Sequence, residues 1–238
     1  MNLGDIISEA LIYPLHNIKA LVLYIVLGII AAIVGGTSII AFLTAAGTTG
    51  ASSFALDGVA ILGIIVFIIL LFLIKGYGLD VVKYGIERRS DTPNIDFARQ
   101  VSNAIKLLAV DIAYYLIPAV IIFVLGFIFR DWILTIISII LIILFALANF
   151  MARCRLAKTD SIGEALAVGE AIGDISRVGI GKLITAILII IIIAVAIIFV
   201  TGLVARINNI LGNVLLGIAM VYLVLFYHRV IGLLYSEV

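Results

Sequence analysis

The most regular feature of the chain is a series of long apolar runs separated by polar segments. A helix that crosses a membrane needs about 20 mostly apolar residues, because the hydrocarbon core of a bilayer is about 30 Å thick. Six runs reach or approach that length: Ala20 to Leu43, Gly58 to Ile74, Leu107 to Phe129, Trp132 to Met151, Leu183 to Val204, and Leu211 to Tyr227. The pattern predicts an all-α, polytopic integral membrane protein with six transmembrane helices.

The composition agrees with that class. Apolar residues make up 65% of the 238 positions and charged residues 12%, against about 45–50% and about 25% in soluble domains. These proportions exclude a water-soluble globular protein. We therefore expect a single membrane domain over residues 1–238, with no soluble domain.

Positive charges are distributed unevenly among the segments between the runs. An even number of spans puts both ends of the chain on one side, and 13 of the 15 Lys and Arg residues then fall on that side. Only Arg130 and Arg206 fall on the other. By the positive-inside rule, the sequence predicts a multi-pass protein of the cell membrane with N- and C-termini in the cytoplasm.

Each pair of predicted spans follows a segment whose apolar residues recur near helical spacing. Residues 3–18, 97–108 and 161–178 show this pattern, which is typical of a helix with one apolar face. The last segment starts with a capping-box pattern at Ser161, and Gly179 suits its end. The predicted architecture is three hairpins of transmembrane helices, each preceded by a short cytoplasmic interfacial amphipathic helix.

The ends of these three units also resemble one another. Phe72, Phe145 and Phe226 begin similar stretches. Two explanations are open. The chain contains three repeats related by an axis near the membrane normal, or the stretches are similar only because apolar sequences align easily with one another. The candidate repeat units are residues 1–89, 90–159 and 160–238.

Asp111 is the one ionisable residue well inside the predicted spans, about one turn into the third. An ionisable group in such a position is a functional candidate by default. Tyr114 and Tyr115 follow it on the same helix, and the fourth span presents Asn149 and Arg153 at the same depth. These residues form either a hydrogen-bonded pair that fixes helix packing, which the shallow depth favours, or a site for a solute or proton.

Three further features have both a structural and a functional interpretation. Pro118 predicts a helix kink in the third span, because its ring removes a backbone hydrogen bond. The basic residues of segment 83–106 suit anionic lipid headgroups, but the acidic residues among them favour ordinary charge that fixes orientation. We expect Arg229 to extend from the end of the last span to the membrane surface.

Small residues recur at four-residue spacing on the first span: Ala31, Ala32, Gly35 and Gly36. Such positions let two helices approach closely. We expect them to serve packing within the protein.

One stretch resembles a known family. The sequence Gly76-Tyr77-Gly78-Leu79-Asp80, followed by Thr92-Pro93-Asn94-Ile95-Asp96-Phe97, is similar to the Gly-Tyr and Pro-x-x-Asp signature of an uncharacterised family of archaeal multi-pass membrane proteins, a domain of unknown function. Asn94 stands where the family usually has an acid. The pairs Tyr13-Pro14 and Phe226-Tyr227 are also similar, so the resemblance extends over nearly the whole chain. It implies the topology and an archaeal origin, and it implies no chemistry.

The function is constrained mainly by what the sequence lacks. It contains no HExxH, GxxxxGK[ST] or GxSxG motif and no cluster of Cys or His, so we expect no enzyme activity, no cofactor and no metal. We also expect no nucleic-acid partner, since the net charge is only +1. The leading interpretation is a scaffold, assembly or regulatory subunit that contacts membrane lipids and a protein partner or a second copy. The alternative is a transporter or channel for a small or lipid-like solute.

Overall fold

The computed structural model describes residues 2–16, 18–46, 51–129 and 131–238. These ranges contain helices and no strand, which confirms the all-α class. The helices are α1 (Leu3–His16), α2 (Ile18–Ala46), α3 (Ala51–Ile86), α4 (Phe97–Leu125), α5 (Asp131–Thr159), α6 (Ile162–Ala165), α7 (Val168–Val178), α8 (Ile180–Ile207) and α9 (Asn209–Tyr235).

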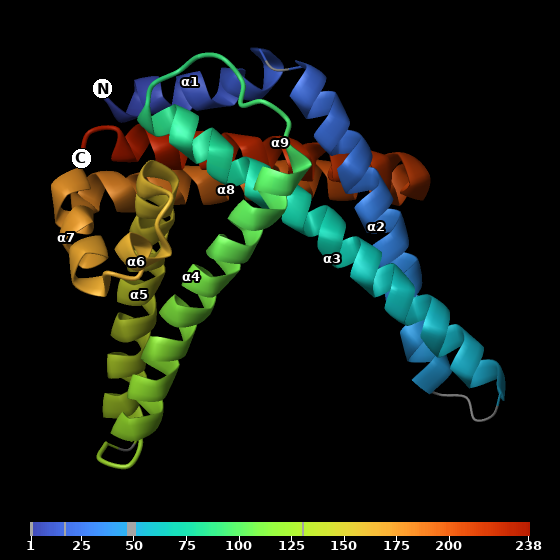
Figure 1. The fold of residues 1–238 in the computed structure, drawn as a ribbon, viewed down its shortest axis with the longest axis horizontal. Coiled ribbons are helices and arrows are strands. Elements are labelled where there is room, and N and C mark those ends of the chain that lie inside the picture. The colour runs from blue at the N-terminus through green and yellow to red at the C-terminus, as the bar shows by residue number, and fades with distance from the viewer. Residues whose placement is uncertain (1, 17, 47–50, 130) are drawn as a thin grey trace.

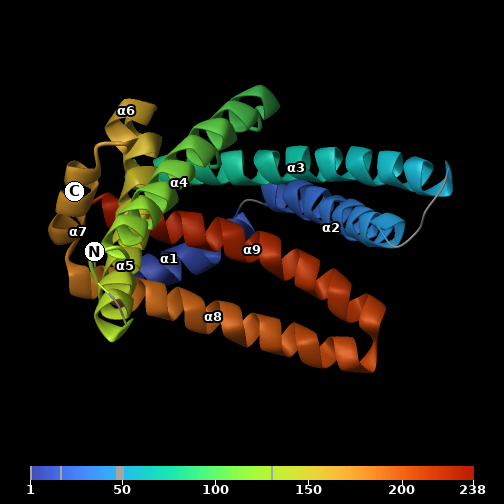
Figure 2. The same ribbon diagram turned by 90° about the horizontal axis from the view of Figure 1, so that it is seen from below.

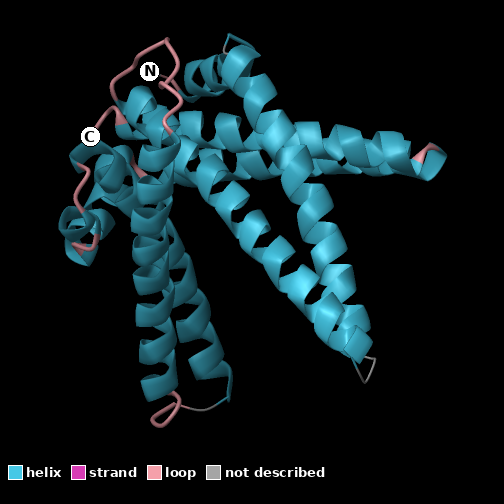
Figure 3. Cartoon of the chain, turned by 45° about the vertical axis from the view of Figure 1, so that its right-hand side comes forward, coloured by secondary structure: helices cyan, strands magenta, loops and turns pink. Residues whose placement is uncertain are grey.

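The long helices pack as consecutive pairs. Helix α2 lies along α3, α4 along α5, and α8 along α9. Figures 1 and 3 show these three pairs, which we call the arms, diverging from one end of the molecule. We call that common end the hub; it consists of α1, α6, α7 and the adjoining parts of the long helices, residues 76–86, 97–110, 148–159 and 225–235.

Six of the helices are long and apolar enough to cross a membrane, as the sequence predicts. The candidate spans are Ile18–Thr44, Gly58–Ile86, Phe97–Leu125, Trp132–Thr159, Ile180–Ile207 and Val214–Tyr235. Four of them continue well beyond the apolar runs into segments that the sequence analysis assigned to cytoplasmic loops. Helix α3 has 36 residues, about 54 Å at 1.5 Å per residue, which exceeds the hydrocarbon thickness. The surplus length of these helices builds the hub.

The hub is densely packed because glycines let its helices cross closely. A Cβ added at Gly232 of α9 would lie 2.3 Å from the carbonyl oxygen of Val82 in α3, and one added at Gly85 would lie 2.9 Å from the Cα of Gly232. Side chains at these positions would push the two backbones apart. Figure 2 shows α9 running between the α2–α3 arm and α8.

Two of the three expected preceding helices are separate elements. Helix α1 precedes the first arm, and α6 with α7 precedes the third. Before the second arm the prediction of a separate short helix is wrong, because Phe97–Leu125 is one continuous helix. No glycine or proline lies between Phe97 and the apolar run, so neither of the strongest helix breakers separates the two segments.

The segment that contains α6 and α7 starts with a Ser161 cap and ends at Gly179, as its sequence predicts. The Ser161 hydroxyl accepts a hydrogen bond from the backbone N–H of Glu164, as in a capping box. The Glu164 carboxylate does not complete the box and instead accepts from Arg155 at 3.0 Å. Gly179 separates α7 from α8 with φ +93°, a conformation that glycine adopts without strain.

Two of the small residues of the first span, Ala31 and Gly35, pack within the protein. Ala31 is buried, and a Cβ at Gly35 would lie 2.7 Å from the ring of Phe67 in α3. Gly36 faces open space. The side chain of Ala32 lies outside the described residues.

Candidate functional site

Asp111 of α4 forms an ion pair with α5. One of its carboxylate oxygens accepts hydrogen bonds from Arg153 Nη2 at 2.7 Å and Nε at 3.0 Å, and from Asn149 Nδ2 at 3.1 Å. Both charged side chains are largely shielded from solvent, 16% exposed for Asp111 and 23% for Arg153. The structure thus brings together three of the five residues that the sequence singled out, in the arrangement expected of a packing contact.

The two tyrosines point elsewhere. Tyr114 is buried and donates its hydroxyl hydrogen bond to the backbone oxygen of Ala165 in α6 at 2.9 Å. Tyr115 is 63% exposed on the outer surface of α4. Tyr114 and Tyr115 lie one turn after Asp111, on either side of its position around the helix. Only the Tyr114 side of α4 packs against the hub.

Pro118 is buried within α4, and the helix continues through it to Leu125. A helical proline leaves the carbonyl four residues earlier, here that of Tyr114, without its usual donor. The kink that the sequence predicts at this position stays a prediction.

The residues that carry the family resemblance lie at the junction of α3 and α4. A Cβ at Gly76 would lie 1.8 Å from the backbone oxygen of Gln100, so only glycine lets the helices cross there. Tyr77 is buried and stacks on Tyr24 of α2, with ring centroids 4.3 Å apart. Pro93 is buried in the connecting segment. Asp96 is the N-cap of α4 and accepts from the N–H of Arg99 at 3.1 Å.

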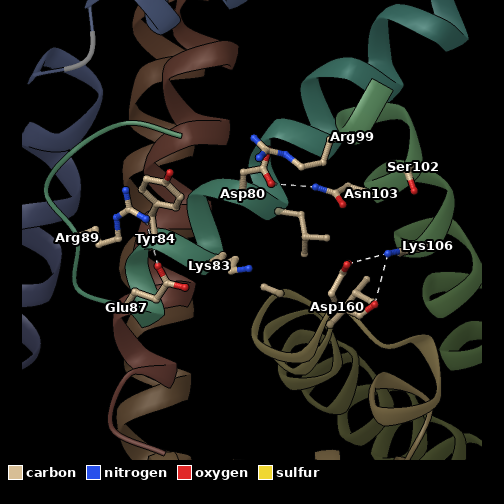
Figure 4. A pocket seen from close by; sticks show the side chains of 13 residues that line it. Asp80, Lys83, Tyr84, Glu87, Arg89, Arg99, Ser102, Asn103, Lys106 and Asp160 are labelled. Atoms are coloured by element: carbon tan, nitrogen blue, oxygen red, sulfur yellow. Dashed lines mark hydrogen bonds and ion pairs between the residues drawn. The ribbon is translucent and has the colours of Figure 1, made fainter. Parts of the chain in front are cut away.

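The same junction forms a polar cavity of about 380 Å³, which we call the hub pocket. Its floor contains Asp80 and Asn103, both buried. Asn103 Nδ2 donates to Asp80 Oδ1 at 3.0 Å, and Arg99 Nη2 lies 3.1 Å from Asp80 Oδ2. At the opposite edge, Lys106 Nζ lies 2.6 Å from Asp160 Oδ1. Figure 4 shows these groups around the pocket, with Lys83 on the α3 side, across from Lys106.

A second, apolar cavity of about 670 Å³ lies between α2, α3 and α9, and we call it the arm groove. Its lining includes the small residues Gly28, Ala31 and Gly217 together with the larger Phe67 and Met220. It lies within the candidate spans.

Arg229 is 1% exposed, so the prediction that it reaches the membrane surface is wrong. Helix α9 continues to Tyr235 and carries Arg229 into the hub. There its Nη2 donates to Glu9 Oε1 of α1 at 2.5 Å, and its guanidinium lies 4.4 Å from the ring centroid of Tyr13. Glu9 and Arg229 are separated by 220 residues, and no local pattern points to their pairing.

Asp174 of α7 is another buried charge that the sequence analysis missed. Its oxygens accept from Arg155 at 3.1 Å, Arg177 at 2.8 Å and the Tyr235 hydroxyl at 2.7 Å. These partners come from α5, α7 and α9, so a single carboxylate connects three helices of the hub. A polar residue on the otherwise apolar face of α7 is the signal that could have found it.

Polar side chains within the arms bond mostly to their own helices. The hydroxyls of Ser138, Thr185 and Thr201 each donate to a carbonyl of the preceding turn, at 2.7, 2.8 and 3.0 Å. Tyr222 instead donates to the carbonyl of Leu11 in α1. Within the described part of the chain, no group of three or more His, Cys, Asp or Glu residues could hold a metal ion.

Comparison with protein families gives one match. Residues 59–206, more than half of the chain, match the family described as "Protein of unknown function (DUF4013)". The chain belongs to this family. Neither curated proteins nor solved structures give a match.

The DUF4013 match starts within α3 and ends at the last turn of α8. It therefore includes the α3–α4 junction, the hub pocket and the Asp111 ion pair. Helix α1 and Arg229 lie outside it, as do the pairs Tyr13-Pro14 and Phe226-Tyr227, so the match is shorter than the nearly full-length resemblance expected.

Proposed function

We propose that this DUF4013 protein is a non-enzymatic membrane scaffold, an assembly or regulatory subunit whose arms pack against other membrane helices. The main observation behind this proposal is that most residues of the arms are not buried by the rest of the protein. In the most apolar window of each candidate span, only 6% to 39% of the residues are buried inside the protein. Three apolar hairpins that diverge from the hub leave long faces open to neighbouring helices.

The hub supports this function by joining the arms firmly. The buried carboxylates of Asp80 and Asp174 each contact more than one donor, and these contacts join α3 to α4 and α7 to α5 and α9. Because an uncompensated buried charge is costly, each of these contacts favours one arrangement of its helices. The arms then have a defined base from which to receive a partner.

The charge distribution supports a cytoplasmic hub. The basic residues of segments 75–106 and 153–182 lie in or next to the hub, whereas the sequence has only Arg130 and Arg206 between the two spans of a pair. By the positive-inside rule, the hub and both termini then face the cytoplasm of the cell membrane. In this orientation α1 and α7 are the interfacial amphipathic helices, and the arms are the three transmembrane hairpins.

Among the described residues the arms show no converging polar side chains, which favours a scaffold over an ion channel. A path for ions needs side chains that converge and replace the water around the ion. Ser138, Thr185 and Thr201 donate to their own helices instead.

Site-specific photo-crosslinking in native membranes tests the proposal. Ile140 of α5 and Phe199 of α8 are 60% and 65% exposed and lie in the halves of their helices that are distant from the hub. A photoreactive residue at each position is expected to give a discrete cross-linked protein, either another subunit or a second copy of the chain. Phe97, which is exposed at the hub end of α4, is the matched control. Adducts with lipid alone at both arm positions would overturn the scaffold function.

The arm groove favours a second candidate, a transporter of a lipid-like solute. An apolar cavity of about 670 Å³ within the spans suits an acyl chain. Gly217→Leu would fill it, since a Cβ added at this position would have Ile29 as its nearest neighbour, at 3.7 Å. If vesicles containing the protein move fluorescent lipid between leaflets and Gly217→Leu slows that movement, the second candidate is favoured. Equal movement in protein-free vesicles would exclude it.

A further inference from the structure

The charges that line the hub pocket are unequal in number. Four cationic side chains, Lys83, Arg89, Arg99 and Lys106, face three carboxylates, Asp80, Glu87 and Asp160.

Each carboxylate has a cationic partner. Asp80 pairs with Arg99 at 3.1 Å, Asp160 with Lys106 at 2.6 Å, and Glu87 with Arg89 at 3.6 Å. Arg89 also pairs, more closely, with Asp91 outside the lining, at 2.5 Å. Within the described residues, Lys83 makes no ion pair and no hydrogen bond. Lys83 is therefore the cation of the lining that remains available to a ligand.

Hydrogen-bond donors also line the pocket. Ser102 lines it from α4 with a hydroxyl that bonds to no other described residue. Figure 4 shows Arg99 beside Asp80 and Lys106 beside Asp160, and both cations keep N–H groups beyond those used by their carboxylates. A phosphate oxygen in the pocket would meet donors from α3 and α4 at once, a suitable arrangement for a multiply charged anion.

The position of the pocket suits a ligand of the membrane surface. Lys83 follows the apolar run that ends at Ile74 by nine residues, about 13 Å along the helix axis. Polar headgroups occupy the few ångströms beyond each side of the hydrocarbon core. If the helix axis is inclined to the membrane normal, the depth difference between Ile74 and Lys83 is smaller than this distance along the axis.

We propose that the hub pocket binds a phosphate group, with Lys83 as its principal cationic contact and Arg99, Ser102 and Lys106 as further donors. The group belongs either to an anionic phospholipid headgroup or to a soluble phosphate compound. This binding goes beyond the scaffold function and does not depend on it, because the pocket lies in the hub and not on the arm faces.

Two measurements on the full chain distinguish the sources. In the first, the protein is purified in nanodiscs of phosphatidylcholine with a minor fraction of phosphatidylglycerol, and native mass spectrometry counts the phosphatidylglycerol retained. In the second, inorganic phosphate or pyrophosphate is titrated against the protein in phosphatidylcholine alone, and the unfolding temperature is followed. Retained lipid identifies a headgroup site, and a rise in unfolding temperature identifies a soluble ligand.

Variants at two lysines of α3 make the test specific. Lys83→Gln is expected to weaken binding about fivefold or more, the effect of one lysine charge near an anionic group, and Lys83→Arg is expected to preserve it. Lys75→Gln is the matched control, since Lys75 is exposed on the same helix but does not line the pocket. Binding in neither measurement, or equal loss in Lys83→Gln and Lys75→Gln, would overturn the proposal.

Discussion

Arg229 of α9 and Glu9 of α1 form an ion pair in which the arginine is almost completely buried and the glutamate is 40% exposed. Two further guanidinium nitrogens of Arg229, Nε and Nη1, have no hydrogen-bond partner among the described residues. The Tyr13 ring covers the guanidinium from one side. The pair holds α1 against the hub and makes Glu9 the main compensation for a buried charge.

Glu9→Gln is therefore expected to destabilise the protein strongly. Removing one partner of a buried ion pair costs about 3 kcal/mol or more, because the other charge stays buried without compensation. The change is measured as the unfolding midpoint in a denaturing-detergent titration. Glu87→Gln is the control, since the Glu87–Arg89 pair is solvent-exposed and such pairs contribute about 0–1 kcal/mol. Equal midpoints for Glu9→Gln and the parent would show that α1 is not held by this pair.

Tyr13 gives the hub a dependence on alkaline pH. Burial raises the pKa of Tyr13 to about 12, against the opposing effect of Arg229, because desolvation disfavours the phenolate. The stabilising effect is fully present below the unfolded pKa of about 10 and is lost as pH rises through the folded pKa. Between these values the parent is expected to lose more stability than Tyr13→Phe, which has no group to ionise. Parallel stability curves for the two proteins in that pH range would contradict this assignment.

Gly76→Ala is expected to disturb the α3–α4 junction. The added methyl group would meet the Gln100 backbone oxygen at 1.8 Å, so the helices must separate, and overpacking of this kind costs about 1–3 kcal/mol. Gly36→Ala is the matched control, with nothing within 4 Å of the new methyl group, and alanine should stabilise that helix by up to about 1 kcal/mol. Opposite changes in unfolding midpoint are expected, and a stable Gly76→Ala protein would show that the close crossing is not required.

Asp111→Asn is expected to reduce stability by about 1.5–3 kcal/mol, the range for a hydrogen bond to a charged group. In this variant the asparagine side-chain oxygen can still accept a hydrogen bond from Arg153, but the negative charge opposite Arg153 is lost. The double variant Asp111→Asn with Arg153→Gln should recover part of that loss, because residues in contact are not additive. If Asp111→Asn keeps full stability and abolishes movement of a solute, Asp111 belongs to a transport site and not to helix packing.

The sequence was sufficient to predict the spans and the Asp111 cluster, because both depend on local signals. An apolar run marks a span, and a carboxylate inside it needs a partner at the same depth on the neighbouring helix. Glu9 with Arg229 and Asp174 with Tyr235 could not be found in this way. Their partners are 220 and 61 residues apart, and only the packing of the hub brings them together.

The helix limits were predicted less well for a different reason. Hydropathy marks where a helix leaves the apolar layer, but α3 and α9 continue as polar or mixed helices to Ile86 and Tyr235. Charged residues such as Lys83 and Arg229 were assigned to the membrane surface for that reason. Their helical continuation is what creates the hub pocket and the buried ion pair.

The distance between two arms in a lipid bilayer shows most directly whether the hub keeps the arms open to a partner. Spin labels at Ile140 of α5 and Phe199 of α8, introduced after replacing the single cysteine Cys154 by alanine, report that distance in nanodiscs without a partner. We expect a narrow distribution of label-to-label distances, well beyond the 8–10 Å that separates the axes of packed helices, because the hub holds α5 and α8 apart. A distribution at packed-helix distance would mean that the six helices close into one bundle, and no open arm faces would remain for a scaffold to use.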